Sequence, residues 1–267
     1  MYKVGIIGNG FVGNAIYQNL KNKIINLYVF DVDPNKSMDS YEKAINSNIV
    51  FVCLPTPMKD RMGGECNLSY IEEFFKNLPF NLNGIFVIKS TIPIGTTEKL
   101  SKFRPDLKII HNPEFLTARN SVEDFYNAER NILGGDLELC KKIEQFYLKH
   151  FPHIPNIIVN SNESESIKYF SNSFLSVKVA YFNLMYELCQ KIGINYDSVK
   201  NGVIADSRIG ASHSLVPGVD GDFGFGGTCF PKDLNSLIKT LENNCVNSSI
   251  LSEVWNYNLS IRKNIDW

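Results

Sequence analysis

The sequence lacks the features that mark several classes of protein. Its six cysteines are scattered without a Cys-x-x-Cys pair, which is not the pattern of a disulfide framework, so we expect a reducing, cytoplasmic setting and no metal site. No apolar run is long enough to span a bilayer, although residues 49–54 are among the longest. The net charge is −1, with lysine and arginine spread along the chain, which gives no electrostatic reason to expect a nucleic-acid or membrane partner.

The first half of the chain alternates short apolar segments with helical ones. At 267 residues it is long enough for one large or two modest domains. The alternation predicts an α/β fold with a doubly wound parallel sheet. The expected strands cover residues 3–7, 27–30, 49–54, 84–90, 108–111, 131–133 and 157–159, with helices up to about residue 20 and at 68–77 and 138–150.

From about residue 161 the apolar residues recur with a helical period. Residues 163–191 contain no glycine or proline and carry apolar residues on one face, which predicts one long helix. Shorter helices are expected at 196–201, 233–243 and 249–265. We therefore expect a nucleotide-binding domain at 1–160 and an all-helical dimerisation domain at 161–267.

A glycine-rich segment directly after the first expected strand points to a dinucleotide. The segment Gly8-Asn9-Gly10-Phe11-Val12-Gly13 lies between a strand and a helix, which is the context that the dinucleotide fingerprint requires. Gly8 permits the tight turn, Gly10 lets a pyrophosphate approach the backbone, and Gly13 lets the helix pack on the strand. Asp31 ends the second strand, where a carboxylate binds ribose hydroxyls and repels a 2′-phosphate, so NAD is the expected cofactor of a Rossmann domain. Lys36 is either a further phosphate contact or a solvated surface lysine.

A second segment places a cysteine between glycines and a Lys-Asp pair. It reads Phe225-Gly226-Gly227-Thr228-Cys229-Phe230-Pro231-Lys232-Asp233. Pro231 suits the first turn of a helix, so we expect Cys229 at a helix N-terminus, with Asp233 one turn further on. A nearby lysine or a helix N-terminus lowers the pKa of a thiol, and the thiolate is the nucleophile. The alternative is a buried structural cysteine in a glycine-rich turn.

Two polar residues on the long expected helix form a further candidate pair. Lys168 and Asn172 are four residues apart and therefore share a face of the helix. A cation and an amide stacked one turn apart can hold an oxyanion or a water between them. The alternative is a pair of solvent-facing side chains.

Six segments in this order resemble the UDP-glucose/GDP-mannose dehydrogenase family, whose members are nucleotide-sugar 6-dehydrogenases. The resemblance runs almost from end to end. No single segment is specific for the family, but the six together are. They are residues 8–13, 51–57, 89–97, 112–116, 165–175 and 224–233.

The resemblance implies a four-electron oxidation in which the C6 alcohol of a nucleotide sugar, with UDP-glucose the first candidate, becomes a carboxylate while two NAD are reduced. By similarity, Cys229 attacks the aldehyde intermediate, the thiohemiacetal releases a second hydride, and water hydrolyses the thioester. Lys168 and Asn172 would steady the oxyanions. Asp233 would position water and catalytic groups, and Glu114 would act as general base for the hydrolysis.

The resemblance also implies the other ligand contacts. Thr91 would orient a water or the nicotinamide region, and Arg208 would reach the substrate site of the neighbouring subunit in a homodimer. The expected cofactor contacts are Gly8, Gly10, Phe11, Val12, Gly13, Asp31, Lys36, Pro55, Thr56, Thr91 and Lys232. The expected substrate contacts are Glu114, Phe115, Leu116, Lys168, Asn172, Arg208, Phe225 and Gly226.

The chain departs from the family pattern in two places. Ala118 stands four residues after Glu114, where many members have an acid, and the chain stops at Trp267, before the C-terminal UDP-binding domain of the family. We therefore expect either a short form with a weaker grip on the nucleotide or a fragment. Two other functions stay open. One is a single-step dehydrogenase of the 6-phosphogluconate or 3-hydroxyacid type, which has no use for a catalytic thiol, and the other is a non-catalytic NAD-binding dimerisation partner.

Overall fold

The computed structural model describes residues 2–267 and divides into two compact units. The first, here called the sheet unit, consists of the chain up to Thr56 and of Asn67–Lys168. The second, the helical unit, consists of Pro57–Cys66 and Tyr169–Trp267. The boundary between the compact units thus falls at Lys168, and the loop before Asn67 belongs with the helices.

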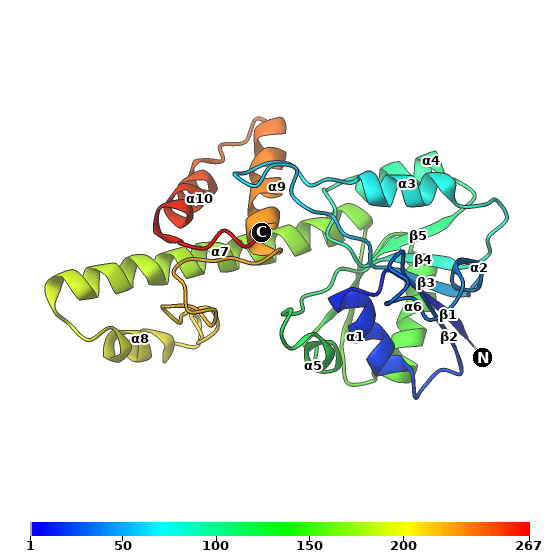
Figure 1. The fold of residues 1–267 in the computed structure, drawn as a ribbon, viewed down its shortest axis with the longest axis horizontal. Coiled ribbons are helices and arrows are strands. Elements are labelled where there is room, and N and C mark those ends of the chain that lie inside the picture. Colours follow the sequence, from blue (N-terminus) through cyan, green and yellow to red (C-terminus); the bar gives the residue numbers. More distant parts are fainter. Residues whose placement is uncertain (1) are drawn as a thin grey trace. The chain divides into compact units, whose positions relative to one another are not determined.

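A seven-stranded sheet forms the sheet unit (Figure 1). Its strands lie in the order β2-β1-β3-β4-β5-β6-β7, so the chain winds outward in both directions from β1, as in other doubly wound folds. This arrangement confirms the expected α/β class. The strands are β1 (Lys3–Ile7), β2 (Asn26–Phe30), β3 (Ile49–Val52), β4 (Ile85–Ile88), β5 (Lys108–His111), β6 (Asn131–Gly134) and β7 (Asn156–Val159).

The expectation that the whole sheet is parallel is wrong at one edge. Strands β1 to β5 are parallel, but β6 pairs antiparallel with β5 through His111 and Gly134, and β7 runs parallel to β6. For two consecutive strands to be parallel, the connection between them must run back along the length of the sheet to the edge where the first strand began. The β5–β6 connection holds only the six-residue helix α5 (Ser121–Tyr126), which rises about 9 Å and packs on α1 (Phe11–Leu20).

Helices cover both faces of the sheet. Strands β3 and β4 are fully buried runs of Ile, Val and Phe, which is typical of parallel strands covered on two sides. One apolar layer includes residues of α1 and α6 (Leu137–His150), and the other includes residues of α2 (Tyr41–Ile45), α3 (Ser69–Asn77) and α4 (Thr96–Phe103). The sequence did not predict α2, α4 and α5, because five to eight residues are too few to display a helical period.

The long helix expected from the sequence is confirmed as α7 (Ser161–Ile192), which has 32 residues and a length of about 48 Å. The rest of the helical unit is α8 (Tyr196–Ile204), α9 (Phe230–Asn243) and α10 (Ser249–Ile261). Helix α9 begins three residues before the expected start, and α10 ends four residues before the expected end. The core of this unit gathers Phe225, Leu234 and Trp255. The indole Nε1 of Trp255 also donates to the carbonyl of Met62 at 3.1 Å, which ties the 57–66 loop to α10.

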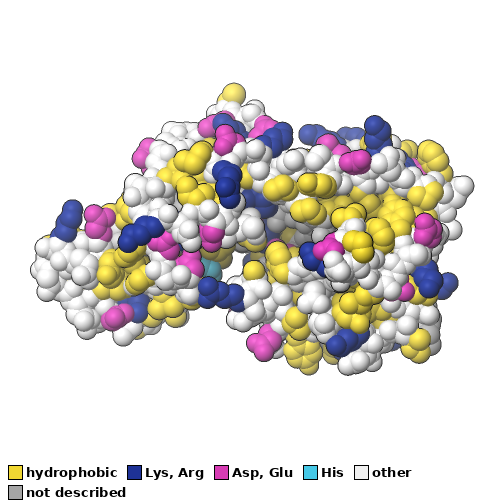
Figure 2. Space-filling model, viewed as in Figure 1, with side chains coloured by type: hydrophobic (Ala, Val, Ile, Leu, Met, Phe, Trp, Pro, Cys, Tyr) yellow, Lys and Arg dark blue, Asp and Glu magenta, His cyan; other side chains and the backbone are white. Residues whose placement is uncertain are grey.

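Apolar side chains reach the surface of the helical unit. On the face drawn in Figure 2, basic and acidic side chains are interspersed, and hydrophobic side chains emerge over α7 and α8. Phe174 on α7 is 67% exposed, and Leu184, Leu188 and Ile192 on the same helix are each about half exposed. A series of this kind on one helix is typical of a face that an assembly covers. Within residues 2–267, no helix is both long and apolar enough to cross a membrane.

A buried histidine links β5 to α7 within the sheet unit. The Nδ1 of His111 lies 2.9 Å from the hydroxyl of Ser164, and its Nε2 lies 3.3 Å from the carbonyl of Ser90. Because the carbonyl only accepts, Nε2 carries the proton and Nδ1 accepts from the hydroxyl. Burial lowers the pKa of His111 to about 3, and the carbonyl of Ser90 opposes that shift only in part.

This burial predicts that the protein loses stability in mild acid. The unfolded histidine takes up a proton near pH 6.5, whereas the folded one does so only near its folded pKa of about 3. Stability is therefore lost as pH falls through this window, by at most about 1.4 kcal/mol per pH unit. Urea unfolding of His111→Gln between pH 4.5 and 7.5 should show a shallower dependence, while His153→Gln, at an exposed site, should match the wild type. Equal slopes for all three proteins would contradict the prediction.

Candidate functional site

The three glycines of the loop between β1 and α1 differ in how much space surrounds them. A Cβ on Gly8, whose φ is +89°, would lie 2.5 Å from the carbonyl oxygen of Cys53, and one on Gly13 would lie 1.9 Å from that of Gly8. A Cβ on Gly10 would meet nothing within 4 Å. The fold itself therefore requires Gly8 and Gly13, whereas the space around Gly10 is open. Gly10 caps α1, whose first turn has no acidic residue, so its amides and dipole favour an anion. These features fit the pyrophosphate of NAD.

The acidic residue expected to bind ribose is anchored at the end of β2. Asp31 Oδ2 accepts the backbone N–H of Asn9 at 2.6 Å, and Oδ1 accepts that of Asp33 at 2.8 Å. Each carboxylate oxygen keeps a lone pair for a further donor. The side-chain oxygen of Asn9 is buried without a hydrogen-bond partner among the described residues. Lys36 lies beside the loop, but its Nζ is 3.7 Å from Asp33 and half exposed.

Two threonines expected to contact ligands lie together after β3 and β4. These strands are neighbours in the sheet, so their carboxyl ends meet at one edge. Thr56 Oγ1 donates to the backbone carbonyl of Thr91 at 2.8 Å, and both residues are buried. Pro55, directly before, is exposed. Phe11 and Val12, the first two residues of α1, are half-exposed and partly buried, respectively.

Glu114 and Lys168 form a buried ion pair in the sheet unit. The Nζ of Lys168 donates to the carbonyl of Glu114 at 2.6 Å and lies 3.4 Å from its Oε1. The backbone N–H of Leu116 donates to the other carboxylate oxygen at 2.6 Å, and the ring of Phe115 lies 5.1 Å from Nζ. Both charged side chains are at least nine-tenths buried. A buried pair with this many partners is the kind of arrangement found at functional sites.

Asp233 is the centre of a second buried cluster, which lies in the helical unit. Its Oδ2 accepts from Asn172 Nδ2 at 2.6 Å and its Oδ1 from Lys232 Nζ at 2.5 Å. The carboxylate is fully buried. Burial is the largest single influence on Lys232 and opposes its charge, but Asp233, Cys66 and Cys229 together outweigh it and raise the pKa of that lysine. Lys232, expected at the cofactor, is thus bound to Asp233.

Cys229 is the residue that caps α9. Pro231 occupies the first turn, and the backbone N–H of Asp233 donates to the carbonyl of Cys229 at 2.8 Å. The expected placement of this cysteine at a helix N-terminus, one turn before the carboxylate, is confirmed. A helix N-terminus favours the thiolate over the thiol. The sulfur of Cys229 also contributes to the raised pKa of Lys232, so the lysine charge acts on it.

The loop before the cysteine is shaped by an asparagine on α10. Asn258 Oδ1 accepts the N–H of Phe225 at 2.7 Å, and its Nδ2 donates to the carbonyl of the same residue at 3.0 Å. The ring of Phe225 is buried, and Gly226 follows it with no room for a Cβ. The backbone of Phe225 is therefore hydrogen-bonded to α10, and a side chain at position 226 would not fit.

Arg208, an expected substrate contact, forms a local ion pair in the helical unit. It lies after α8, and its side chain is 88% exposed. Its guanidinium pairs with Asp206, two residues earlier, through Nε at 3.0 Å and Nη2 at 2.6 Å. Within one chain it is a surface ion pair.

Three buried polar residues had no role in the sequence analysis. Glu165 on α7 accepts from the N–H groups of Gly95 and Thr97 and from the Thr97 hydroxyl, all within 2.8 Å, and so caps α4. Lys89 donates to Asn112 at 2.9 Å, and burial lowers its pKa to about 8. Asn258 is the third. A polar residue among buried positions of a helix or strand was the available signal in each case.

The sheet topology and the glycine loop are those of an NAD-binding α/β protein. Residues 35–151 match the NAD binding domain of the UDP-glucose/GDP-mannose dehydrogenase family, and residues 162–260 match its central domain. The chain belongs to the UDP-glucose/GDP-mannose dehydrogenase family.

Two curated relatives carry the same name. The chain is 31% identical over 279 residues to UDP-glucose 6-dehydrogenase TuaD of Bacillus subtilis, covering 90% of this chain and 59% of that protein. It is 34% identical over 224 residues to UDP-glucose 6-dehydrogenase of Rickettsia bellii, covering 80% and 49%. The chain thus spans about half to three fifths of the length of these relatives.

Solved structures share the fold. A UDP-glucose dehydrogenase from Pyrobaculum islandicum superposes with a TM-score of 0.84 at 24% identity, covering 97% of this chain and 68% of that one. Mycobacterium tuberculosis 3-hydroxyisobutyrate dehydrogenase superposes with a TM-score of 0.76 at 16% identity, covering 96% and 92%. At these identities the likeness shows the fold alone.

The contrast between two glycines predicts separable effects on folding and on cofactor binding. Gly13→Ala forces a Cβ against a backbone oxygen and should lower the free energy of unfolding by about 2 kcal/mol. Gly10→Ala should leave stability unchanged and raise the dissociation constant for NAD about tenfold or more, because the methyl group fills the space kept for the pyrophosphate. Urea unfolding and calorimetric titration with NAD measure the two effects. Full NAD affinity in Gly10→Ala would contradict the assignment of this space.

Proposed function

We propose that the chain catalyses the NAD-dependent four-electron oxidation of the C6 alcohol of a nucleotide sugar to the carboxylate. UDP-glucose is the first candidate substrate, since the curated relatives are named UDP-glucose 6-dehydrogenases. The observation that carries the proposal is Cys229 at the N-terminus of α9, one turn before a buried Asp233. A single-step alcohol dehydrogenase needs no nucleophile there.

The residues of the chain suit covalent catalysis of the second oxidation. When bound, NAD accepts the hydride in each oxidation. The thiolate of Cys229 adds to the aldehyde carbon, and the carbonyl oxygen becomes the hydroxyl of a thiohemiacetal. Loss of a hydride and a proton leaves a thioester, and water then releases the carboxylate and restores the thiol. A thiolate leaves readily, so the last step needs no strong acid.

The buried polar groups have distinct roles in this scheme. Lys168 and Asn172, one turn apart on α7, stabilise negative charge on the substrate oxygen. Glu114 acts as general base toward the hydrolytic water, and its contact with Lys168 orients the carboxylate. Asp233 fixes the amide of Asn172, and Thr91 orients a water or the nicotinamide region.

We further propose a homodimer formed through the apolar face of α7. Phe174, Leu184 and Leu188 are exposed on this helix, and a second copy supplies a complementary apolar surface. In such a dimer Arg208 exchanges its local partner Asp206 for the anionic nucleotide sugar bound to the neighbouring subunit. A guanidinium suits phosphate groups because it donates two parallel hydrogen bonds.

Two other functions compete with this proposal. The chain covers 92% of a 3-hydroxyisobutyrate dehydrogenase in the fold comparison, which favours a single-step hydroxyacid dehydrogenase as the second candidate. A non-catalytic NAD-binding partner is the third. Neither explains the cluster that joins Cys229 through Asp233 to Asn172 and Lys232.

A substrate panel tests the proposed activity. The purified protein is mixed with NAD and with UDP-glucose, GDP-mannose, UDP-GlcNAc, UDP-N-acetylmannosamine, 6-phosphogluconate or 3-hydroxyisobutyrate, and NADH is followed at saturating substrate. A rate with one or more nucleotide sugars supports the proposal. A rate confined to the last two compounds identifies a single-step dehydrogenase, and no rate with any of them supports a binding partner.

Replacing the nucleophile should stop the reaction before the carboxylate. Cys229→Ser should yield no uronate and should accumulate an aldehyde-level or covalent species, because an alkoxide leaves far less readily than a thiolate. Mass spectrometry of the sugar products measures this. Cys245→Ser, which changes an exposed cysteine, is the matched control and should behave as wild type. Uronate formation by Cys229→Ser at the wild-type rate would rule out the thiol mechanism.

The anchored carboxylate at the end of β2 predicts cofactor selectivity. Asp31 faces the ribose position with two oxygens already held in place and repels a 2′-phosphate. We expect kcat/KM for NAD to exceed that for NADP by about a hundredfold or more. Asp31→Asn should reduce this ratio at least tenfold, which corresponds to a loss of about 1.4 kcal/mol of discrimination between the two cofactors. Equal turnover of the two cofactors by the wild type would refute the role of Asp31.

A further inference from the structure

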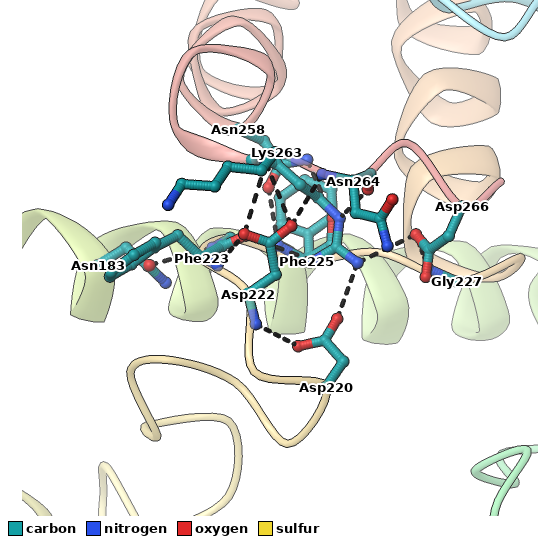
Figure 3. A network of polar contacts seen from close by, with 12 residues as sticks. Asn183, Asp220, Asp222, Phe223, Phe225, Gly227, Asn258, Lys263, Asn264 and Asp266 are labelled. Carbon is teal, nitrogen blue, oxygen red and sulfur yellow. Dashed lines mark hydrogen bonds and ion pairs between the residues drawn. The ribbon is translucent and has the colours of Figure 1, made fainter.

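The segment that follows α10 is fastened to the glycine loop that precedes the cysteine. Figure 3 shows the contacts, all of which lie in the helical unit. Asp222 accepts the backbone N–H groups of Lys263 and Asn264 at 3.1 and 2.9 Å. Its own side chain also accepts from Phe223 N at 2.8 Å. Together with the clamp of Asn258 on Phe225, these bonds already hold the segment in place.

A buried arginine adds a second set of contacts directed at the loop. The side chain of Arg262 is 2% exposed. Its Nη2 lies 2.7 Å from Asp220 Oδ2 and 3.0 Å from Asp266 Oδ1, and its Nη1 donates to the carbonyl of Phe223 at 3.3 Å. The same Asp266 oxygen accepts the N–H of Gly227 at 3.0 Å. One guanidinium therefore connects the beginning, the middle and, through Asp266, the end of the loop 220–227.

The backbone of the loop packs directly on this cation. A Cβ on Gly226 would lie 1.9 Å from Nη2 of Arg262 and 2.4 Å from Asp266 Oδ1. Gly224 and Gly227 have φ of +69° and +71°, a region that favours glycine. Glycine has more conformational freedom to lose than any other residue. A loop this rich in glycine holds a single shape only if other groups impose it.

We propose that Arg262 is a positioning residue for Cys229: together with Asp266 it fixes the glycine loop, and through the loop it sets where the thiol that caps α9 is presented. This inference rests on the proposed function for the role of the thiol. Gly227 is two residues before Cys229, so a shift of the loop moves the capping residue itself. Because productive attack requires placement within a fraction of an ångström, the loss of this support lowers the rate rather than the affinity.

Three variants separate positioning from general stability. Arg262→Lys keeps the charge but loses the planar fork, whose Nη2 contacts both aspartates while Nη1 donates to the carbonyl of Phe223. Asp266→Asn keeps an acceptor for Gly227 and removes one of the two carboxylates that pair with Arg262. Lys263→Ala is the matched control, since Lys263 is exposed and contributes its backbone N–H to Asp222. Each full-length protein is examined by hydrogen exchange, by the pH dependence of Cys229 alkylation with iodoacetamide, and by kcat and KM on the nucleotide sugar that the panel identifies.

We expect amide exchange in residues 224–229 to rise about tenfold in Arg262→Lys, with exchange in the sheet unit unchanged. Alkylation of Cys229 should require a higher pH, because the loosened cap no longer holds the thiolate at the helix N-terminus. The value of kcat should fall about tenfold or more with KM within about twofold. Asp266→Asn should show the same changes to a smaller extent, and Lys263→Ala should show none.

A different result overturns the proposal. If Arg262→Lys and Asp266→Asn lower the melting temperature but leave the exchange of residues 224–229 and the alkylation profile as in the wild type, Arg262 only stabilises the fold. If only KM changes, the arginine acts on binding and not on the thiol. Exchange and alkylation need no substrate, so they decide the question even if the wild type oxidises no nucleotide sugar, a result that would count against the proposed function alone.

Discussion

The helical unit is organised around one buried carboxylate. Asp233 has no exposed surface, and a buried charge is tolerated only with close partners. Asn172 and Lys232 supply them at 2.6 and 2.5 Å, and the position of Asp233 in the first turn of α9 is what aligns these bonds. The same turn places Cys229 at the cap. Removing one partner of a buried pair costs about 3–5 kcal/mol, so the position of the thiol is set by a network that tolerates little change.

The sheet unit also contains buried charges that are stabilised by close partners. Glu114 and Lys168 are buried together, and Leu116 and the carbonyl of Glu114 complete their hydrogen bonds. Glu165, one turn before Lys168 on α7, is held by the N-terminus of α4. In both units a buried charged side chain is held by a second buried polar side chain: Lys168 by Glu114 in the sheet unit, and Asp233 by Asn172 and Lys232 in the helical unit. Buried charged groups of this kind are common at reactive sites, although apolar side chains in the same positions would stabilise the fold more simply.

Much of this could be predicted from the sequence because the signals are local. The apolar runs of β3 and β4 and the uninterrupted stripe of α7 have a period that identifies them. The glycines of the first loop and Pro231 in the first turn of α9 act within a few residues of their position. Helices α2, α4 and α5 were missed because they are too short to display a helical period. The other failures have a second cause. The direction of β6, the cap that Glu165 provides and the contact of Arg262 with Asp220 depend on residues far apart in the chain, and the last two join partners 68 and 42 residues apart. No local sequence pattern encodes such a partner.

The most direct test of the account is the number of NADH molecules formed per sugar consumed. A limiting, measured amount of UDP-glucose is oxidised to completion with excess NAD. The amount of NADH is measured by absorbance, and the sugar product is identified by mass spectrometry. We expect two NADH and one uronate for each sugar if the thiol of Cys229 carries the aldehyde to the second oxidation. One NADH per sugar with an aldehyde as the final product would contradict it.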